Sequence, residues 1–131
     1  MTVLFKVSPP GPFDGDFLRL SARPYGPVRL AAGDRVFFWW SETQKGVGLA
    51  GHGLCVRVLG ASGDMTVEVE PIQFANTGFG KQDLAPHRSA GPGTPLGRLA
   101  AKLYKNSLNK VVMVDRGEEE FLDAQFAAIA R

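Results

Sequence analysis

The chain of 131 residues has the length of one domain and can bury about two-thirds of its unfolded surface, enough for a single core. With 44% hydrophobic and 21% charged residues, its composition is typical of a globular protein and excludes an intrinsically disordered chain. Fifteen Lys and Arg against 13 Asp and Glu leave a net charge of +2, which excludes a strongly basic, sequence-blind nucleic-acid binder but leaves room for local basic patches. We expect one domain over residues 1–131.

Cysteine and histidine are too scarce for a disulfide framework or an ordinary metal site. The single cysteine, Cys55, excludes an internal disulfide and a zinc site built on paired cysteines, and it favours a reducing compartment. His52 and His87 are far apart, so we expect no metal and no cofactor. No apolar run approaches the ~20 residues that span a bilayer, and Pro9 and Pro10 interrupt the start too early for a signal peptide. The sequence predicts a cytoplasmic protein without a membrane partner.

The first half of the chain reads as short strands separated by Gly- and Pro-rich turns. The segment 34–41, DRVFFWWS, is dense in aromatic and β-branched residues, which suit a half-buried sheet better than a helix. In 65–74, apolar and polar residues alternate with a period of two, as in a strand with one wet face. The predicted strands are 2–7, 17–21, 34–41, 47–59 and 65–74.

The second half mixes a long loop with helices. Residues 75–94 contain several glycines and prolines and predict a loop. Pro95 suits the first turn of a helix whose apolar residues recur at helical spacing as far as Tyr104. Residues 110–115 predict a strand, and 118–131 a terminal helix with glutamates in its first turn. This order predicts an α+β fold, a small and mainly antiparallel β-barrel with peripheral helices, rather than a βαβ succession.

Two parts of the chain resemble the EVE domain, a family of the PUA-like superfamily. One part is a Gly-Asp pair, an aromatic strand with a polar end and a Gly-rich strand. The other is a closing strand before an acidic helix start. The matching residues are Gly33-Asp34-Arg35-Val36-Phe37-Phe38-Trp39-Trp40-Ser41 with 46–51, and Asn109-Lys110-Val111-Val112-Met113-Val114 with 118–121.

The resemblance implies a PUA-like barrel with a concave pocket, because relatives in that superfamily accept flipped, modified bases in such pockets. The chain departs from the family in 17–30, where an Asn- and Arg-containing stretch is expected and is not evident. Because of this departure, we expect the pocket of this protein to differ from that of ordinary family members. The fold alone does not determine the ligand.

Trp39 and Trp40 are the first candidates for a ligand site. Because they are adjacent on a predicted strand, their side chains point to opposite faces and only one can join the main core. The other indole can form a stacking wall for a base, worth ~1–3 kcal/mol per stacked base. In the alternative, the barrel covers one ring and a helix covers the other.

Three polar residues complete the predicted ligand site. Ser41 and Glu42 end the aromatic strand, where a hydroxyl and a carboxylate can bond the polar edge of a flat ligand, although ordinary turn chemistry also explains them. His52 lies between two glycines on the next strand and can reach a ligand without crowding, or it is a structural histidine.

Five basic residues are candidates for contacts with nucleic acid. If the long loop and the helix at 95–104 meet, their basic side chains can follow a phosphate backbone with modest, salt-sensitive affinity. Solvated surface charge is the alternative interpretation. The five candidates are Arg35, Lys81, Arg88, Lys102 and Lys105.

Three functional hypotheses remain open. The first is a non-enzymatic module that binds a modified nucleobase in DNA or RNA, or a nucleotide-like ligand, between an aromatic wall and polar groups. The second is a regulatory domain that binds a small molecule and no nucleic acid. The third is a small hydrolase that uses His52 with a carboxylate such as Glu42. The sequence contains no phosphate-binding loop, because Gly78-Phe79-Gly80-Lys81 lacks the Gly-Lys-Ser/Thr ending.

Overall fold

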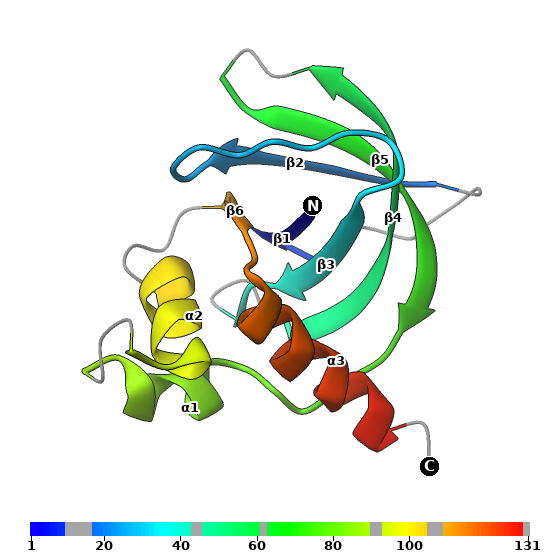
Figure 1. Ribbon diagram of the computed structural model, residues 1–131. Coiled ribbons are helices and arrows are strands. Elements are labelled where there is room, and N and C mark those ends of the chain that lie inside the picture. Colours follow the sequence, from blue (N-terminus) through cyan, green and yellow to red (C-terminus); the bar gives the residue numbers. More distant parts are fainter. Residues whose placement is uncertain (10–16, 43–45, 61–62, 90–92, 105–108, 130–131) are drawn as a thin grey trace.

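The protein is a closed barrel in the computed structural model, which describes residues 1–9, 17–42, 46–60, 63–89, 93–104 and 109–129. Around the barrel, the six strands of this part of the chain follow the order β1-β3-β4-β5-β2-β6 (Figure 1). The strands are β1 (Thr2–Val7), β2 (Leu18–Pro24), β3 (Arg35–Trp40), β4 (Gly48–Gly60), β5 (Met65–Phe74) and β6 (Lys110–Met113).

The barrel is mixed, with antiparallel pairing dominant. Among the described strands, four neighbouring pairs are antiparallel, while β1 with β3 and β2 with β6 are parallel. Register shifts in β4 opposite β5 let this long strand curve around the barrel, as bulges do. The predicted α+β class and the small, mainly antiparallel barrel with peripheral helices are confirmed.

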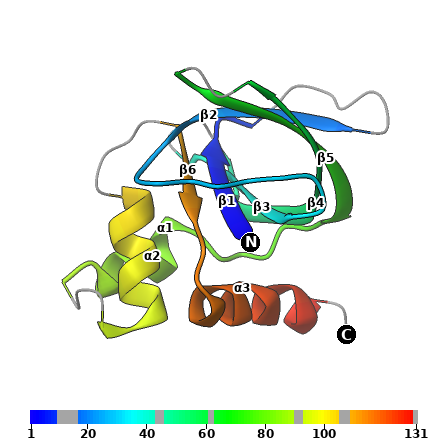
Figure 2. The same cartoon turned by 45° about the horizontal axis from the view of Figure 1, so that its top comes forward.

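The helices gather on one side of the barrel (Figures 1 and 2). They are α1 (Lys81–Leu84), the 3-10 helix η2 (Ala85–His87), α2 (Pro95–Tyr104) and α3 (Arg116–Ile129). The helix predicted from Pro95 is confirmed. The prediction of a continuous loop over 75–94 is wrong, because α1 and η2 lie within it and are too short to produce a helical repeat in the sequence.

A capping box sets the boundary between β6 and α3. The amide of Glu118 donates to Asp115 Oδ1 at 2.8 Å, and the amide of Asp115 donates to Glu118 Oε1 at 2.9 Å. This exchange satisfies two amides at the start of the helix. Consequently β6 ends at Met113 and α3 begins at Arg116, two residues before the predicted start at Glu118.

Strand β1 is buried along its whole length because it separates two apolar clusters. Val3 and Phe5 face the barrel interior, and Leu4 faces the helices. The inner cluster also contains Val36, Phe38, Cys55 and Val67, and the outer cluster contains Phe37, Trp39, Leu99, Leu103 and Leu122. Within the described part of the chain, no helix has the length and apolar character needed to cross a bilayer.

Candidate functional site

The two tryptophans lie on opposite faces of β3, as the two-residue period of a strand predicts. Trp39 is fully buried on the outer face, where its ring packs edge-on against Phe79 and Tyr104 at centroid distances of 5.9 and 6.3 Å. Trp40 is half-buried and stacks on Phe38 of the inner cluster at 5.5 Å. Since a fully buried indole has no free face, a ligand that stacked on Trp39 would have to displace these rings.

Trp40 lines a shallow depression of about 300 Å³, the aromatic hollow. Phe74, at the end of β5, lies on the same hollow, is 49% exposed and has its ring 5.4 Å from that of Phe38. Trp40 and Phe74 therefore provide aromatic surface at the end of the barrel. The remaining lining residues are Val47, Ala50, Ala75 and Asn76.

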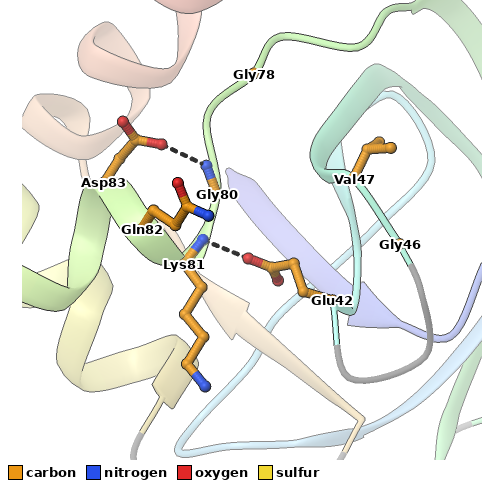
Figure 3. A pocket seen from close by; sticks show the side chains of 8 residues that line it. All are labelled: Glu42, Gly46, Val47, Gly78, Gly80, Lys81, Gln82 and Asp83. Atoms are coloured by element: carbon orange, nitrogen blue, oxygen red, sulfur yellow. Dashed lines mark hydrogen bonds between the residues drawn. The ribbon is translucent and has the colours of Figure 1, made fainter.

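A second depression of about 320 Å³, the polar hollow, adjoins the first because Val47 lines both. Figure 3 shows that Glu42 and Asp83 point toward the backbone of the segment at the start of α1. Asp83 Oδ2 accepts a hydrogen bond from the Gly80 amide at 2.9 Å. The lining residues are Glu42, Gly46, Val47, Gly78, Gly80, Lys81, Gln82 and Asp83.

Glycine allows the walls of the polar hollow to approach one another. Gly48 has a φ of +84°, and a Cβ there would lie 2.5 Å from the carbonyl oxygen of Phe79. The neighbouring amide of Leu49 donates to that same oxygen at 3.0 Å. Residues 79–80 therefore pack backbone against backbone on the start of β4, an approach that a side chain at position 48 would prevent.

Glu42 is the polar centre of this region. Its Oε1 accepts from Trp39 Nε1 at 2.9 Å, and the Tyr104 hydroxyl lies 3.1 and 3.0 Å from the two carboxylate oxygens. The amide of Lys81 donates to Oε2. Burial, and then the Glu42 charge, raise the pKa of Tyr104 well above its ordinary value, so this hydroxyl keeps its proton and donates.

The structure separates His52 from Glu42. His52 lies on β4 beneath α3, with its ring 4.8 Å from that of Phe126, and its nitrogens lie 3.4 Å from Arg35 Nη2 and 3.2 Å from Gln73 Oε1. Burial lowers the pKa of His52 from its ordinary value. Both residues have other partners, so the geometry does not assemble the acid–base pair of the hydrolase hypothesis.

Ser41 is buried at the end of β3. Its amide donates to the Val7 carbonyl at 2.8 Å, and its carbonyl accepts from Gly46 at 2.9 Å. These backbone bonds fix the end of β3 and hold Gly46, which lines the polar hollow, beside it. Of the five predicted ligand residues, Trp40 lines the aromatic hollow and Glu42 lines the polar hollow. Trp39 and Ser41 are buried and line neither hollow, and His52 lies beneath α3.

The basic candidates divide into two groups. Arg35 pairs with Glu119 and Asp123 of α3, and Lys102 pairs with Glu118 at 2.6 Å, so acidic partners already offset their charges. Lys81 is exposed on the polar hollow. Arg88 is also exposed and donates to the Tyr104 carbonyl at 3.2 Å. Lys105 lies outside the described residues.

Several residues of this region were not predicted from the sequence. Phe74 could have been found as an aromatic residue at a strand end, next to the long connection. No pattern in the sequence singles out Gln82 or Asp83. The glycines at 48 and 80 are the sign in the sequence that two backbones meet here.

The described residues contain no group of three or more His, Cys, Asp or Glu side chains that could hold a metal ion. Comparison with family models, with curated proteins and with solved structures finds no match to this chain.

Proposed function

We propose that this protein is a non-enzymatic binding module that holds a flat ring against Trp40, with a modified nucleobase in DNA or RNA, or a nucleotide-like ligand, as its guest. Membership of the EVE domain family, within the PUA-like superfamily, is part of the proposal. The resemblance over 33–41 and 46–51 supports it, because these residues form β3, the start of β4 and part of the wall of both hollows.

The observation that carries the proposal is the setting of Trp40. Its indole is backed by Phe38 at 5.5 Å, with an interplanar angle of 18°, and it lines a hollow together with the exposed ring of Phe74. A ring held from behind loses little freedom when a ligand stacks on it, and base stacking contributes ~1–3 kcal/mol.

Lys81 and Arg88 support a nucleic-acid partner, because both are exposed on the segment beside the polar hollow. Two phosphate contacts on a single strand give a slope of about −1.4 in a plot of log affinity against log salt concentration. The alternative is a small-molecule site without nucleic acid. It is favoured by the ion pairs of Arg35 and Lys102, which offset the charge of two of the four described basic candidates, and it predicts binding nearly indifferent to salt.

Titration of Trp40→Ala with nucleosides and with short oligonucleotides, with and without base modifications, tests the proposal. We expect affinity to fall about 10- to 100-fold relative to the unchanged protein, and Trp40→Phe to keep most of it. Ile72→Ala is the matched control, because Ile72 is 59% exposed on the same strand as Phe74 and lines neither hollow. If Trp40→Ala binds as well as the unchanged protein, stacking on Trp40 is refuted.

The hydrolase hypothesis has its own test. His52→Ala leaves Trp40 and Glu42 in place, so ring binding should persist in this variant. Any hydrolytic turnover by the protein that disappears with His52 would contradict a purely binding role.

A further inference from the structure

We propose, resting on the function above, that Asn76 determines which rings the aromatic hollow accepts, by donating a hydrogen bond from its side-chain amide to an acceptor on the ring edge. The ligand class is a heterocycle with a carbonyl oxygen on that edge, as in uracil or hypoxanthine, in preference to the matching ring with an exocyclic amine, as in cytosine or adenine. Every base has a face that can stack on Trp40, so the edge decides between them.

Asn76 lies on the same side of its segment as Phe74. The ring of Phe74 contacts the inner cluster, whereas the next residue, Ala75, packs against the outer cluster. The pairing of β5 with β4 continues at this point, because the Ala75 amide donates to the Ala50 carbonyl at 2.9 Å. Residues two positions apart in such a segment share a face. Phe74 and Asn76 therefore face the same way, and both line the aromatic hollow with Trp40.

The hollow is small enough for one ring to reach both Trp40 and Asn76. Its volume of about 300 Å³ is at the lower end of the range for small-molecule pockets. The rings of Trp40 and Phe74 both pack on Phe38, at 5.5 and 5.4 Å, so the aromatic surface lies together on one side of the depression. Because Asn76 lines this same depression, the edge of a ring stacked on Trp40 lies beside it.

The backbone orients the carboxamide of Asn76. The Gly78 amide lies 3.1 Å from Oδ1, and because an amide N–H donates, the bonded atom is the carboxamide oxygen. The two N–H groups of Nδ2 therefore point away from this bond, and among the described residues neither has a hydrogen-bond partner. Since Asn76 is exposed, these donors are accessible to a ligand. A side chain already held by one bond loses little freedom when it binds.

The polar side chains of the aromatic hollow are mainly donors. Apart from Trp40 and Asn76, the described residues that line it have apolar side chains. Asn76 provides the two N–H groups of Nδ2 and Trp40 its indole N–H, against one remaining acceptor position on Asn76 Oδ1. A carbonyl oxygen on the ring edge complements these donors, whereas an exocyclic amine in its place would set N–H against N–H.

The test compares bases that differ in a carbonyl against an amine. Inosine is measured against adenosine, and uridine against cytidine, each as the nucleoside and as the central residue of the same trinucleotide. We expect the carbonyl-bearing member to bind about three- to tenfold more tightly, as for one neutral hydrogen bond. Equal affinities within both pairs, or tighter binding of the amines, overturn this inference and leave ring binding on Trp40 intact. Failure of every ligand to bind overturns the proposed function, and this inference with it.

Two substitutions connect the preference to Asn76. Asn76→Asp keeps an oxygen for the Gly78 amide and replaces the N–H donors by a second acceptor, so both affinity ratios should fall to one or below. Asn76→Ala removes donor and acceptor together and should bring both ratios close to one.

The matched control is Asn109→Asp. It adds the same charge at an exposed position that lines neither hollow, so the ratios should stay at their original values. A preference that persists unchanged in Asn76→Asp and Asn76→Ala, or that Asn109→Asp abolishes equally, assigns the selectivity to another cause and overturns the role of Asn76.

Discussion

Lys6 and Lys110 lie opposite each other in the antiparallel pair of β1 and β6, and both ammonium groups donate to the last turn of α2. Lys6 Nζ lies 2.8 Å from the Leu103 carbonyl, and Lys110 Nζ lies 2.9 Å from the Lys102 carbonyl. Both residues are at most 2% exposed. The two cations thus satisfy carbonyls that a helix end leaves unpaired, at the favourable end of its dipole.

Burial, and then the neighbouring charge of Lys110, lower the pKa of Lys6 to about 8, with the Lys81 charge acting the same way and Glu42 opposing both. The unfolded chain has the ordinary value of 10.5, so it binds more protons than the folded protein between these two pH values. This group therefore makes the free energy of unfolding rise with pH above about 8, by at most about 1.4 kcal/mol per pH unit.

Urea unfolding of the unchanged protein and of Lys6→Met, at several pH values from 7 to 9.5, measures this contribution. The difference in unfolding free energy should shift in favour of the unchanged protein as pH rises. Groups that do not interact with Lys6, such as Cys55, are common to both proteins and cancel in the difference. A difference independent of pH would mean that Lys6 has the same pKa in both states.

Glu118 is expected to be essential for the start of α3. It is fully buried, and its Oε1 accepts from Lys102 Nζ at 2.6 Å and from the Asp115 amide at 2.9 Å. Glu118→Ala removes both acceptors and should reduce the unfolding free energy by about 2 kcal/mol or more. Glu118→Gln keeps one carbonyl acceptor, so its unfolding free energy should fall less than that of Glu118→Ala.

The matched control for this prediction is Glu120→Ala in the same helix. Glu120 is 71% exposed and pairs only loosely with Arg116 at 3.5 Å, so we expect a loss below about 0.5 kcal/mol. Thermal unfolding of the three variants is sufficient. Equal losses at positions 118 and 120 would show that the capping box contributes nothing specific.

Gly48→Ala should close or distort the polar hollow. The added Cβ would meet the Phe79 carbonyl oxygen at 2.5 Å and Gly80 Cα at 2.8 Å, in addition to the strain of a positive φ. Gly63→Ala is the control, because Gly63 has a φ of +81° and nothing within 4 Å of its Cβ position, and its strain alone is about 1–2 kcal/mol. We expect Gly48→Ala to be clearly less stable in denaturant titrations and to bind rings more weakly. Equal stability of the two variants would contradict the close backbone approach.

Quenching of fluorescence distinguishes the two tryptophans directly. In Trp40→Phe the sole indole is Trp39, which is fully buried and bonded to Glu42, so acrylamide should quench it much less than the unchanged protein. Its emission should also lie at shorter wavelength. Quenching as efficient as in the unchanged protein would mean that Trp39 is as accessible as Trp40, which contradicts its burial.

Local patterns in the sequence predicted much of the fold. Alternation of apolar and polar residues and the placement of turns located the strands 2–7 and 65–74, and the helical spacing after Pro95 located α2. The opposite orientation of Trp39 and Trp40 follows from the period of a strand alone. These properties depend on residues a few positions apart, which is why they can be recognised in the sequence.

Only the tertiary structure decided which indole faces a hollow and which polar groups meet. Glu42 contacts Tyr104, 62 positions along the chain, and Arg35 is offset by Asp123, 88 positions away. Closure of the barrel and the packing of α1, α2 and α3 on one side produce these contacts. The local periodicity of the sequence does not indicate these contacts, because their energies depend on burial and on partners that only the folded chain brings together.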